Sequence, residues 1–296
     1  MHHQTKQLLP FSRFISNHSG VPMNQSIEII CIGNELLIGK TLNTNAQWLA
    51  KRITTMGLDA HRITIVGDKI NVISSVIQEA IHRKPSFILI TGGLGPTFDD
   101  KTLEGIAKAL GSKIEVNKTA LKMVKEKYLN YALEIRMEAV ELTPQRVKMA
   151  KLPEGATPLS NPVGTAPAVS IKHENTTLIA LPGVPHEMMR IFDESVVPLM
   201  NQAAQGVAYF EMSIHSTNVM ESEMAPIIVK VMKNNPYVYI KSHPKGSELV
   251  PHIEFHLSTT ANDVSTAKQY VRNVLLQLTE LIQKKGGKIK SVVSEI

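Results

Sequence analysis

The sequence predicts an α/β protein with a first domain built around a mostly parallel sheet and a second, smaller α+β domain. Between residues 27 and 110, short apolar runs alternate with amphipathic segments of helical periodicity, which is typical of βαβ units and a parallel sheet. From Tyr209 onward, strand-like segments instead alternate apolar and polar residues, as in a sheet with one buried face. With 296 residues, 43% of them hydrophobic, the chain is long enough for two such domains.

Apolar runs and helical stripes define the elements of the first domain in chain order. The strands are continuous apolar runs, and the helices carry apolar residues three or four positions apart and end near glycine. The predicted strands cover Ser26–Ile32, His61–Val66 and Phe87–Ile90, and the helices cover Asn43–Gly57, Ile70–Ile81 and Leu103–Leu110.

Capping residues and turn signals predict the elements beyond Gly111. Asn117 is expected to cap a helix that runs to Tyr131, because asparagine favours the N-cap position. Thr143-Pro144 is expected to open another helix, since proline favours the first helical position. Two apolar runs around a polar turn predict a hairpin of Val169–Lys172 with Thr177–Leu181.

Polar residues follow several of the predicted parallel strands. Because the predicted strands are parallel, their carboxyl ends meet at one edge of the sheet, where ligands bind in such folds. Individually, Glu35 and Asp68 could equally be solvated loop residues or helix caps. The residues expected to converge on this edge are Glu35, Asn43, Asn45, Asp68, Asp99 and Asp100.

The loop after the third strand combines a glycine-rich turn with two carboxylates. Amides of Gly92, Gly93 and Gly95, together with a helix N-terminus, are suited to binding phosphate. Asp99 and Asp100, expected in the first helical turn, would repel a bare phosphate, and Mg²⁺ bound by carboxylates and substrate phosphates resolves this conflict. In the alternative reading, Thr97 is only a helix N-cap and the two acids only complement the helix dipole.

Two segments rich in Gly and Pro are expected to form rigid loops near the hairpin. They cover Asn161–Pro167 and Leu181–Met188. Purely structural turns explain both segments, but each also offers backbone amides and a polar side chain to a ligand. The candidate ligand contacts are Asn161, Gly164, Thr165, Gly183 and Glu187.

Composition excludes several classes of protein. No apolar stretch approaches the about twenty residues of a membrane span, and no signal-peptide core is present, so a cytoplasmic protein without a membrane partner is expected. The single cysteine, Cys31, lies in a predicted strand and is expected to be a buried, inert thiol. The net charge of +6 is mildly basic and does not indicate a dedicated nucleic-acid binder.

The two ends of the chain are polar. Residues 1–26 show no clear periodicity and are expected to be a disordered extension. At the other end, a lysine cluster is expected to be the solvated end of the last helix rather than a nucleic-acid contact, because cations suit that end of the helix dipole. The cluster consists of Lys284, Lys285, Lys288 and Lys290.

Residues 204–296 are predicted to form a small domain with the order β-α-β-β-α. His252 and His256 share a strand face with Glu254, for which a solvated polar face is favoured over a metal site. A sheet this small gains from pairing its edge with a second subunit, so a homodimer is expected. The predicted strands cover Phe210–Ser216, Tyr237–Ile240 and Val250–Ser258, and the helices cover Ser222–Met232 and Asp263–Lys284.

Six motifs between Ile27 and Met200 occur in the order found in the competence/damage-inducible protein A (CinA) family, which the chain therefore resembles. They are Gly33-Asn34-Glu35-Leu36-Leu37-Ile38-Gly39, Asn43-Thr44-Asn45, Val66-Gly67-Asp68, Thr91-Gly92-Gly93-Leu94-Gly95-Pro96-Thr97 with Asp99-Asp100, Asn161 with Gly164-Thr165-Ala166-Pro167, and Leu181-Pro182-Gly183-Val184-Pro185 with Glu187.

The resemblance implies a fold and an activity. It implies a three-layer α/β/α sandwich of the molybdopterin-binding kind over residues 27–203 and a KH-like domain after it. It also implies hydrolysis of ADP-ribose to AMP and ribose 5-phosphate with a divalent metal, Mg²⁺ or alternatively Mn²⁺ or Co²⁺. The nicotinamide-mononucleotide deamidase domain of longer members is not expected here. RNA binding is not expected either, because the second domain has no Gly-x-x-Gly between two helices.

The leading hypothesis is therefore a metal-dependent hydrolase of a nucleoside diphosphate linkage. Asp99 and Asp100 would hold the metal, and Glu35 or Asp68 would orient or deprotonate the attacking water. One alternative is a molybdopterin-binding protein or transferase of cofactor biosynthesis, as in fold relatives with a similar glycine-rich loop. The other is a nucleotide-binding protein without catalytic activity.

Overall fold

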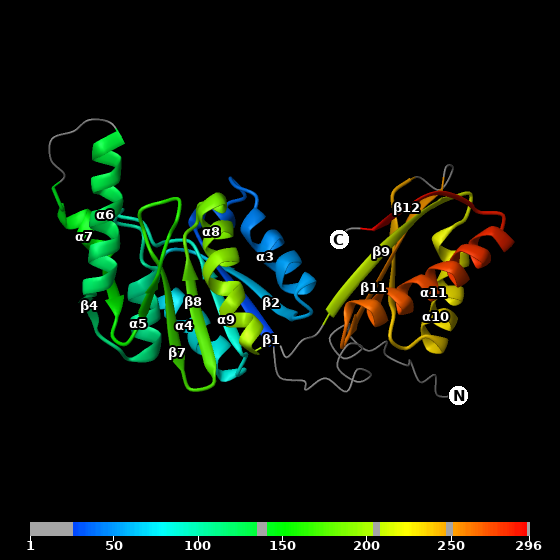
Figure 1. Ribbon diagram of the computed structural model, residues 1–296, viewed down its shortest axis with the longest axis horizontal. Helices are drawn as coiled ribbons and strands as arrows, with labels where there is room; N and C mark the ends of the chain where they lie inside the picture. Colours follow the sequence, from blue (N-terminus) through cyan, green and yellow to red (C-terminus); the bar gives the residue numbers. More distant parts are fainter. Residues whose placement is uncertain (1–25, 135–140, 204–207, 247–250, 295–296) are drawn as a thin grey trace. The chain divides into compact units, whose positions relative to one another are not determined.

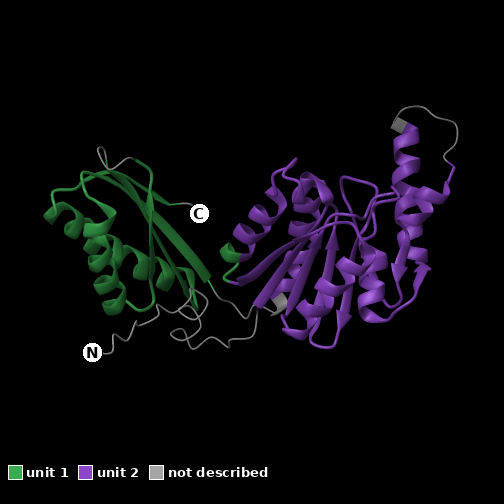
Figure 2. Ribbon diagram, turned by 180° about the vertical axis from the view of Figure 1, so that it is seen from behind, with its two compact units in different colours: residues 1–23, 54–57, 206–296 green, residues 24–53, 58–205 purple. Residues whose placement is uncertain are grey.

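A computed structural model of the protein describes residues 26–134, 141–203, 208–246 and 251–294. Residues 1–25, most of the predicted N-terminal extension, lie outside the described residues. The chain divides into two compact units near residue 205, and Figure 2 colours them separately. None of the described helices is both long and apolar enough to cross a membrane.

A six-stranded sheet forms the centre of the first unit. Its order is β2-β1-β3-β8-β7-β6. Strands β2, β1, β3 and β8 are parallel, whereas β7 is antiparallel to β8 and β6 to β7, so the prediction of a mostly parallel sheet is confirmed. The strands are β1 (Ser26–Ile32), β2 (Asp59–Val66), β3 (Phe87–Thr91), β6 (Thr157–Leu159), β7 (Ala168–His173) and β8 (Thr176–Leu181).

The helices of the first unit agree with most of the predicted ranges. The Asn117 side chain accepts a hydrogen bond from the Ala120 amide, and Thr143 accepts one from the Arg146 amide, so both predicted caps are present. The helices are α2 (Asn34–Leu37), α3 (Thr44–Thr55), α4 (Ile70–His82), α5 (Thr102–Leu110), α6 (Lys118–Glu134), α7 (Pro144–Lys148), α8 (Pro185–Ile191), the π-helix η1 (Phe192–Val196) and α9 (Val197–Ala203).

Helices cover both faces of this sheet, which gives three layers (Figure 1). On one face, Ile88 and Ile90 of β3 pack in a fully buried cluster with Ile77 of α4 and Ile106 of α5. The other face is covered by α3 and the α8–α9 segment, whose rings Trp48 and Phe192 meet edge to face at 5.5 Å between centroids. Side chains on both faces of β3 are buried, so its sequence is a continuous apolar run.

Several short elements were not predicted. β4 (Ile114–Val116) pairs with β5 (Lys151–Pro153), and β6, α2, α8, η1 and α9 are also additional. Helix α8 begins at Pro185, so the last four residues of the predicted rigid loop Leu181–Met188 are helical, with proline at the first helical position. The strands β4, β5 and β6 and the helix α2 have only three or four residues, too few to show the periodicity that distinguishes helix from strand, so the sequence carries no clear signal for them.

The second unit has the order β-α-β-β-α-β, one strand more than predicted. Its antiparallel sheet has the order β10-β11-β9-β12, and one face packs against α10 and α11 around a core that includes Phe255 and Leu278. This is the split βαβ arrangement. Its elements are β9 (Ala208–Thr217), α10 (Glu221–Asn234), β10 (Tyr239–Pro244), β11 (His252–Ala261), α11 (Val264–Lys284) and β12 (Lys288–Ser294).

The additional strand corrects the interpretation of the lysine cluster. Lys284 and Lys285 lie at the end of α11, but Lys288 and Lys290 belong to β12, which pairs with β9. Gly286, with φ of 83°, turns the chain out of the helix and into this strand. Pairing of a sheet edge with a second subunit stays a prediction.

The two histidines of β11 lie on one strand face, as predicted, opposite the buried Ile253 and Phe255. His256 lies between Glu211, at 3.3 Å, and Ser213, at 3.4 Å, and Ser213 donates to Glu254. No cluster of three or more metal-ligating side chains is found among the described residues. Hydrogen bonds therefore engage Glu211, Ser213, Glu254 and His256 on this face, whereas His252 Nε2 is buried without a partner among the described residues.

Cys31 is buried, as predicted. Burial raises the pKa of its thiol, and a hydrogen bond with Asn43 opposes this effect. A protonated, inaccessible thiol is a poor nucleophile, so Cys31 has a structural role.

Candidate functional site

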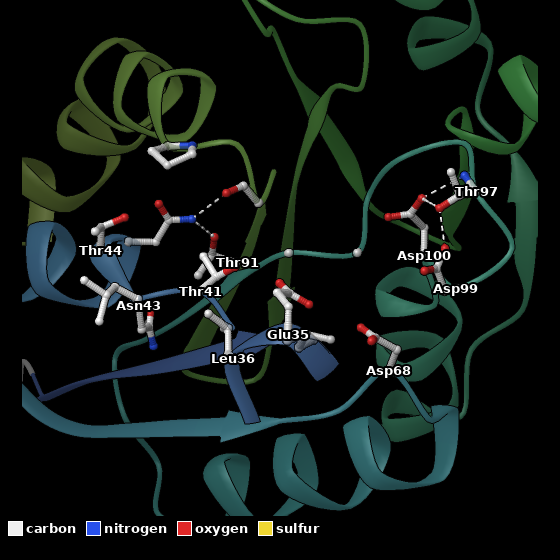
Figure 3. A pocket seen from close by; sticks show the side chains of 18 residues that line it. Glu35, Leu36, Thr41, Asn43, Thr44, Asp68, Thr91, Thr97, Asp99 and Asp100 are labelled. Atoms are coloured by element: carbon white, nitrogen blue, oxygen red, sulfur yellow. Dashed lines mark hydrogen bonds between the residues drawn. The ribbon is translucent and has the colours of Figure 1, made fainter. Parts of the chain in front are cut away.

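A cavity of about 250 Å³ opens at the carboxyl ends of β1, β2, β3 and β8, the edge predicted for a ligand (Figure 3). The predicted residues that line it are Glu35, Asn43, Asn45, Asp68, Gly92, Gly93, Thr97, Asp99, Asp100 and Gly183. Residues missed by the sequence interpretation also line it, namely Ile32, Gly33, Leu36, Thr41, Leu42, Thr44, Thr91 and Pro185. Most of these missed residues are neighbours of predicted ones, so proximity in the chain was the available signal.

The cavity is acidic. Glu35, Asp68, Asp99 and Asp100 line it, and no Lys, Arg or His does so among the described residues. Figure 3 shows Asp68, Asp99 and Asp100 on one side, the neutral amide and hydroxyl groups of Asn43, Thr44 and Thr91 on the other, and Glu35 between the two sets. An anionic ligand would therefore need a bound cation to offset four negative charges.

The acidic loop, which carries Thr97, Asp99 and Asp100, forms a turn of its own before helix α5. The Asp100 carboxylate accepts hydrogen bonds from the Thr97 amide at 2.8 Å and from its hydroxyl at 2.6 Å. Helix α5 begins only at Thr102, so Asp99 and Asp100 are not in its first turn and Thr97 is not its N-cap, contrary to both readings of the sequence. The local side-chain hydrogen bonds of Thr97 stabilise a turn in place of another helical turn.

Asp99 and Asp100 approach the same hydroxyl group. The Thr97 hydroxyl lies within hydrogen-bond distance of both carboxylates, although its one proton can serve only one of them. The hydrogen bond with Thr97 is the main cause that lowers the pKa of Asp99 below its ordinary value, so this group is ionised at neutral pH. Two convergent anionic oxygen donors suit a hard cation such as Mg²⁺.

These carboxylates do not make a complete metal site on their own. No group of three or more His, Cys, Asp or Glu side chains arranged to hold a metal is present in the described part of the chain. Mg²⁺ usually keeps several water ligands and is bound through one or two carboxylates plus substrate phosphates. Asp99 and Asp100 fit a Mg²⁺ site of this kind, in which the phosphates of the ligand and water supply the remaining oxygens.

Gly92 and Gly93 hold the loop close to its neighbours. Gly92 has φ of 106°, its amide donates to the Leu181 carbonyl, and a Cβ there would lie 2.2 Å from the Ile32 carbonyl oxygen. A Cβ on Gly93, which has φ of 66°, would lie 2.3 Å from the Thr102 hydroxyl oxygen. The Gly92 amide is therefore not available to a phosphate, and Gly93 is the loop glycine suited to that contact in this cavity.

The helix N-terminus is also partly occupied. The Thr102 amide donates to the Gly93 carbonyl at 3.3 Å, and the Thr102 hydroxyl donates to the Gly92 carbonyl at 2.7 Å. Gly95 does not line the large cavity but a smaller one behind the loop, which it shares with Gly93 and Asp100. Contrary to expectation, the first amide of α5 binds the loop itself.

Asn45 is buried where α3 meets the cavity. Its Nδ2 donates to the Thr91 hydroxyl at 3.0 Å and to the Gly183 carbonyl at 2.8 Å. Its Oδ1 is buried and has no hydrogen-bond partner among the described residues. An unsatisfied buried acceptor costs about 1–3 kcal/mol, so this oxygen lowers the local stability.

The remaining polar residues of the cavity differ in whether their side chains accept hydrogen bonds from the protein. Asn43 caps α3 by accepting a hydrogen bond from the Ala46 amide at 3.1 Å, and Asp68 accepts one from the Asn34 amide at 3.0 Å. The exposed Glu35 carboxylate has no hydrogen-bond partner among the described residues. Glu35 is therefore the acid that is most available to a water molecule.

Asn161, Gly164, Thr165 and Glu187 do not line the large cavity. Asn161, Gly164 and Glu187 contact one another, whereas the Thr165 hydroxyl lies 3.9 Å from Met149 Sδ. Asn161 donates to Glu187 at 2.7 Å and to the Ala166 carbonyl at 2.9 Å, and its Oδ1 accepts from the amides of Val163 and Gly164. All its hydrogen-bonding capacity is used within the protein. A Cβ on Gly164 would lie 2.0 Å from Glu187, so this glycine permits a close approach. The observed contacts favour the structural reading of this loop.

Lys148 of α7 donates hydrogen bonds to backbone carbonyls of the acidic loop. Its ammonium donates to the carbonyls of Thr97 at 2.5 Å, Asp100 at 2.6 Å and Gly95 at 3.3 Å. Burial lowers the pKa of Lys148, while the charge of Asp100 opposes this shift. The sequence interpretation missed Lys148, because nothing in its local motif indicates a contact with a loop about fifty residues earlier.

Replacing Lys148 is expected to loosen this loop. Lys148→Met removes three charge-assisted contacts and should lower the free energy of unfolding by about 2 kcal/mol, whereas Lys148→Arg should retain much of the stability. Urea unfolding would measure the stabilities. Lys122→Met, at a largely exposed lysine of α6, is the matched control. Equal stabilities of Lys148→Met and the control would contradict a positioning role.

Comparison with known proteins identifies relatives of this chain. Residues 28–202 match the family model described as a probable molybdopterin binding domain. A protein of Pyrobaculum arsenaticum is 43% identical over 260 residues, 88% of this chain and 95% of the relative. A protein of Sulfolobus acidocaldarius is 41% identical over 271 residues, 91% of this chain and 99% of the relative.

A solved structure resembles the first unit. It is the crystal structure of the protein CinA with unknown function from Thermoplasma acidophilum, which is 36% identical and covers 61% of this chain and 98% of its own, with a TM-score of 0.54. The likeness agrees with the order of motifs in the sequence.

Proposed function

Because the chain belongs to the family of probable molybdopterin-binding domains and is similar to CinA, we propose that its acidic cavity binds a phosphorylated ligand together with a divalent cation. The ligand we propose is ADP-ribose, hydrolysed to AMP and ribose 5-phosphate. The observation that carries this proposal is a cavity lined by four carboxylates and by no basic side chain of the described residues. A diphosphate in such a cavity requires positive charge, which a divalent cation supplies.

The residues of the cavity have separate roles in this proposal. Asp99 and Asp100 hold the cation, and the Gly93 amide donates to a phosphate oxygen. The cation, when bound, neutralises charge that develops on the diphosphate. Glu35, whose carboxylate is free of hydrogen bonds among the described residues, orients a water molecule and accepts its proton as the water oxygen attacks phosphorus. The bond from that phosphorus to the bridging oxygen breaks, and the second phosphate leaves with this oxygen.

Molybdopterin is the second candidate ligand. The match of residues 28–202 to a probable molybdopterin binding domain favours it. Molybdopterin also carries a phosphate and an amino-substituted ring, so the same cavity could bind it by similar contacts. The two candidates differ in whether a diphosphate bond is broken.

Chromatographic detection of AMP and ribose 5-phosphate tests the proposal. The purified full chain should release both products from ADP-ribose with Mg²⁺, Mn²⁺ or Co²⁺ and none after chelation of the metal. Absence of products with all three metals would contradict the hydrolase assignment. Tight binding of molybdopterin without hydrolysis of ADP-ribose would support the second candidate.

A further inference from the structure

The side of the cavity that carries no carboxylate also presents apolar surface. Leu42 directly precedes Asn43 and Thr44, which Figure 3 shows on the side away from the acidic loop. Leu42 lines the cavity although it is 84% exposed, and Leu36 and Pro185 line the cavity with it. These three side chains form an apolar wall, and a ligand that covers the wall gains the free energy of burying its surface.

Local hydrogen bonds fix the backbone that carries Leu42. The Thr44 amide donates to the Leu42 carbonyl at 2.8 Å, which closes a three-residue turn around Asn43. The Asn43 side chain in turn accepts a hydrogen bond from the Ala46 amide at 3.1 Å. The exposed Leu42 side chain therefore extends from an ordered backbone, so a ligand can cover it without the cost of ordering the chain.

Asn45 joins the two segments that carry the apolar wall. Its side-chain nitrogen donates to the Gly183 carbonyl at 2.8 Å, two residues before Pro185. Pro185 is exposed and is the first residue of α8, where its ring restricts the backbone. Leu42 and Pro185 are far apart in the sequence, but they line one cavity from two segments that this hydrogen bond holds together.

We propose that the planar aromatic ring of a nucleotide packs against the apolar wall, while its diphosphate binds with the cation at Asp99 and Asp100. This inference rests on the proposed function, because the position of the diphosphate determines which end of the ligand reaches the wall. A flat ring offers Leu42 and Pro185 a continuous apolar face, whereas the sugar and the phosphates are polar. The wall therefore recognises the ring, and the cation recognises the diphosphate.

Phe98 is the competing apolar contact for such a ring. It lies between Thr97 and Asp99 on the acidic loop and is 86% exposed. Phe98 does not line the cavity, whereas Leu42 does. Because the two side chains are similarly exposed, Phe98 provides a matched control for Leu42.

Calorimetric titration of the full chain with Mg²⁺ tests the contact with two ligands, ADP and ribose 5-diphosphate, which lacks the base. Both ligands bring the same diphosphate to the cation, so the ratio of their affinities measures the contribution of the ring. ADP is expected to bind at least about tenfold more tightly. Burial of about 55 Å² of apolar surface is sufficient for this ratio.

The variant Leu42→Ser connects the ratio to the apolar wall. The ratio should fall by at least about threefold, while the affinity for ribose 5-diphosphate stays within about twofold of the wild-type value. Phe98→Ser also replaces a large exposed apolar side chain and should keep the wild-type ratio. Both side chains are largely exposed, so both variants are expected to fold.

Several results would overturn the inference. Equal affinities of the wild-type protein for ADP and ribose 5-diphosphate would contradict it, and so would a wild-type ratio in Leu42→Ser. A lower ratio in Phe98→Ser alone would assign the ring to the acidic loop instead of the wall. In each of these cases both ligands still bind with Mg²⁺, so only the inference fails. If neither ligand binds, the proposed function fails with it.

Discussion

Neutralising the paired acids of the loop is expected to lower the rate of metal-dependent ADP-ribose hydrolysis by at least about 100-fold, whereas the protein stays folded. Asp99→Asn and Asp100→Asn each keep the size of the side chain and remove one charge from the cation site. Asp100→Asn can still accept hydrogen bonds from Thr97 through its amide oxygen. Initial rates with saturating Mg²⁺ and thermal melting of each variant would measure the two effects.

A control variant distinguishes loss of the cation site from the loss of one negative charge elsewhere in the protein. Glu79→Gln removes one carboxylate from α4, where Ser75 donates to it, and it does not line the cavity. Its hydrolysis rate should equal that of the wild-type protein. Wild-type rates in both Asp variants would show that the paired carboxylates are not needed for the reaction. A large loss of stability with activity retained would instead support a structural role for the two acids.

Gly92→Ala is expected to have the largest effect on stability. The residue has φ of 106°, and the added Cβ would lie 2.2 Å from the Ile32 carbonyl oxygen, which belongs to a central strand and cannot move easily. Backbone strain alone costs about 1–3 kcal/mol. Displacement of the loop adds to it, and nucleotide binding should be lost with the geometry of the cavity. Urea unfolding and calorimetric titration would measure stability and binding.

Gly111→Ala is the matched control for this effect. Gly111 also has a positive φ, 64°, but a Cβ there would meet no atom within 4 Å. This variant should lose only about 1 kcal/mol and bind nucleotide normally, because only the backbone preference is disturbed. Equal losses of stability in the two variants would mean that the close approach to Ile32 contributes little.

The sheet edge that carries the site could be predicted from the sequence, because it depends on topology. Parallel strands separated by helices bring Glu35, Asp68 and Asp99 to one edge whatever the details of packing. The strands β1 and β3 could be predicted from their apolar runs. The helices after Asn117 and Thr143 could be predicted from these capping residues. Each of these signals is contained in a few neighbouring residues.

The contacts that determine the chemistry could not be predicted in this way. The Thr97–Asp100 turn replaces the expected helical start because of side-chain hydrogen bonds that compete with the helix. Lys148 and the Asn45–Gly183 contact join distant parts of the chain, for which periodicity carries no signal. Asn161 is a residue type that often contacts ligands, but its side chain donates to Glu187 instead.

The dependence of nucleotide affinity on divalent cation tests the central claim most directly. Calorimetric titration of the wild-type chain with ADP, in the presence of Mg²⁺ and again after complete chelation, would measure it. Four carboxylates and no basic side chain line the cavity in the described part of the chain, so binding should be at least about 100-fold weaker without the cation. The same affinity under both conditions would contradict a cation-bridged phosphate in this cavity.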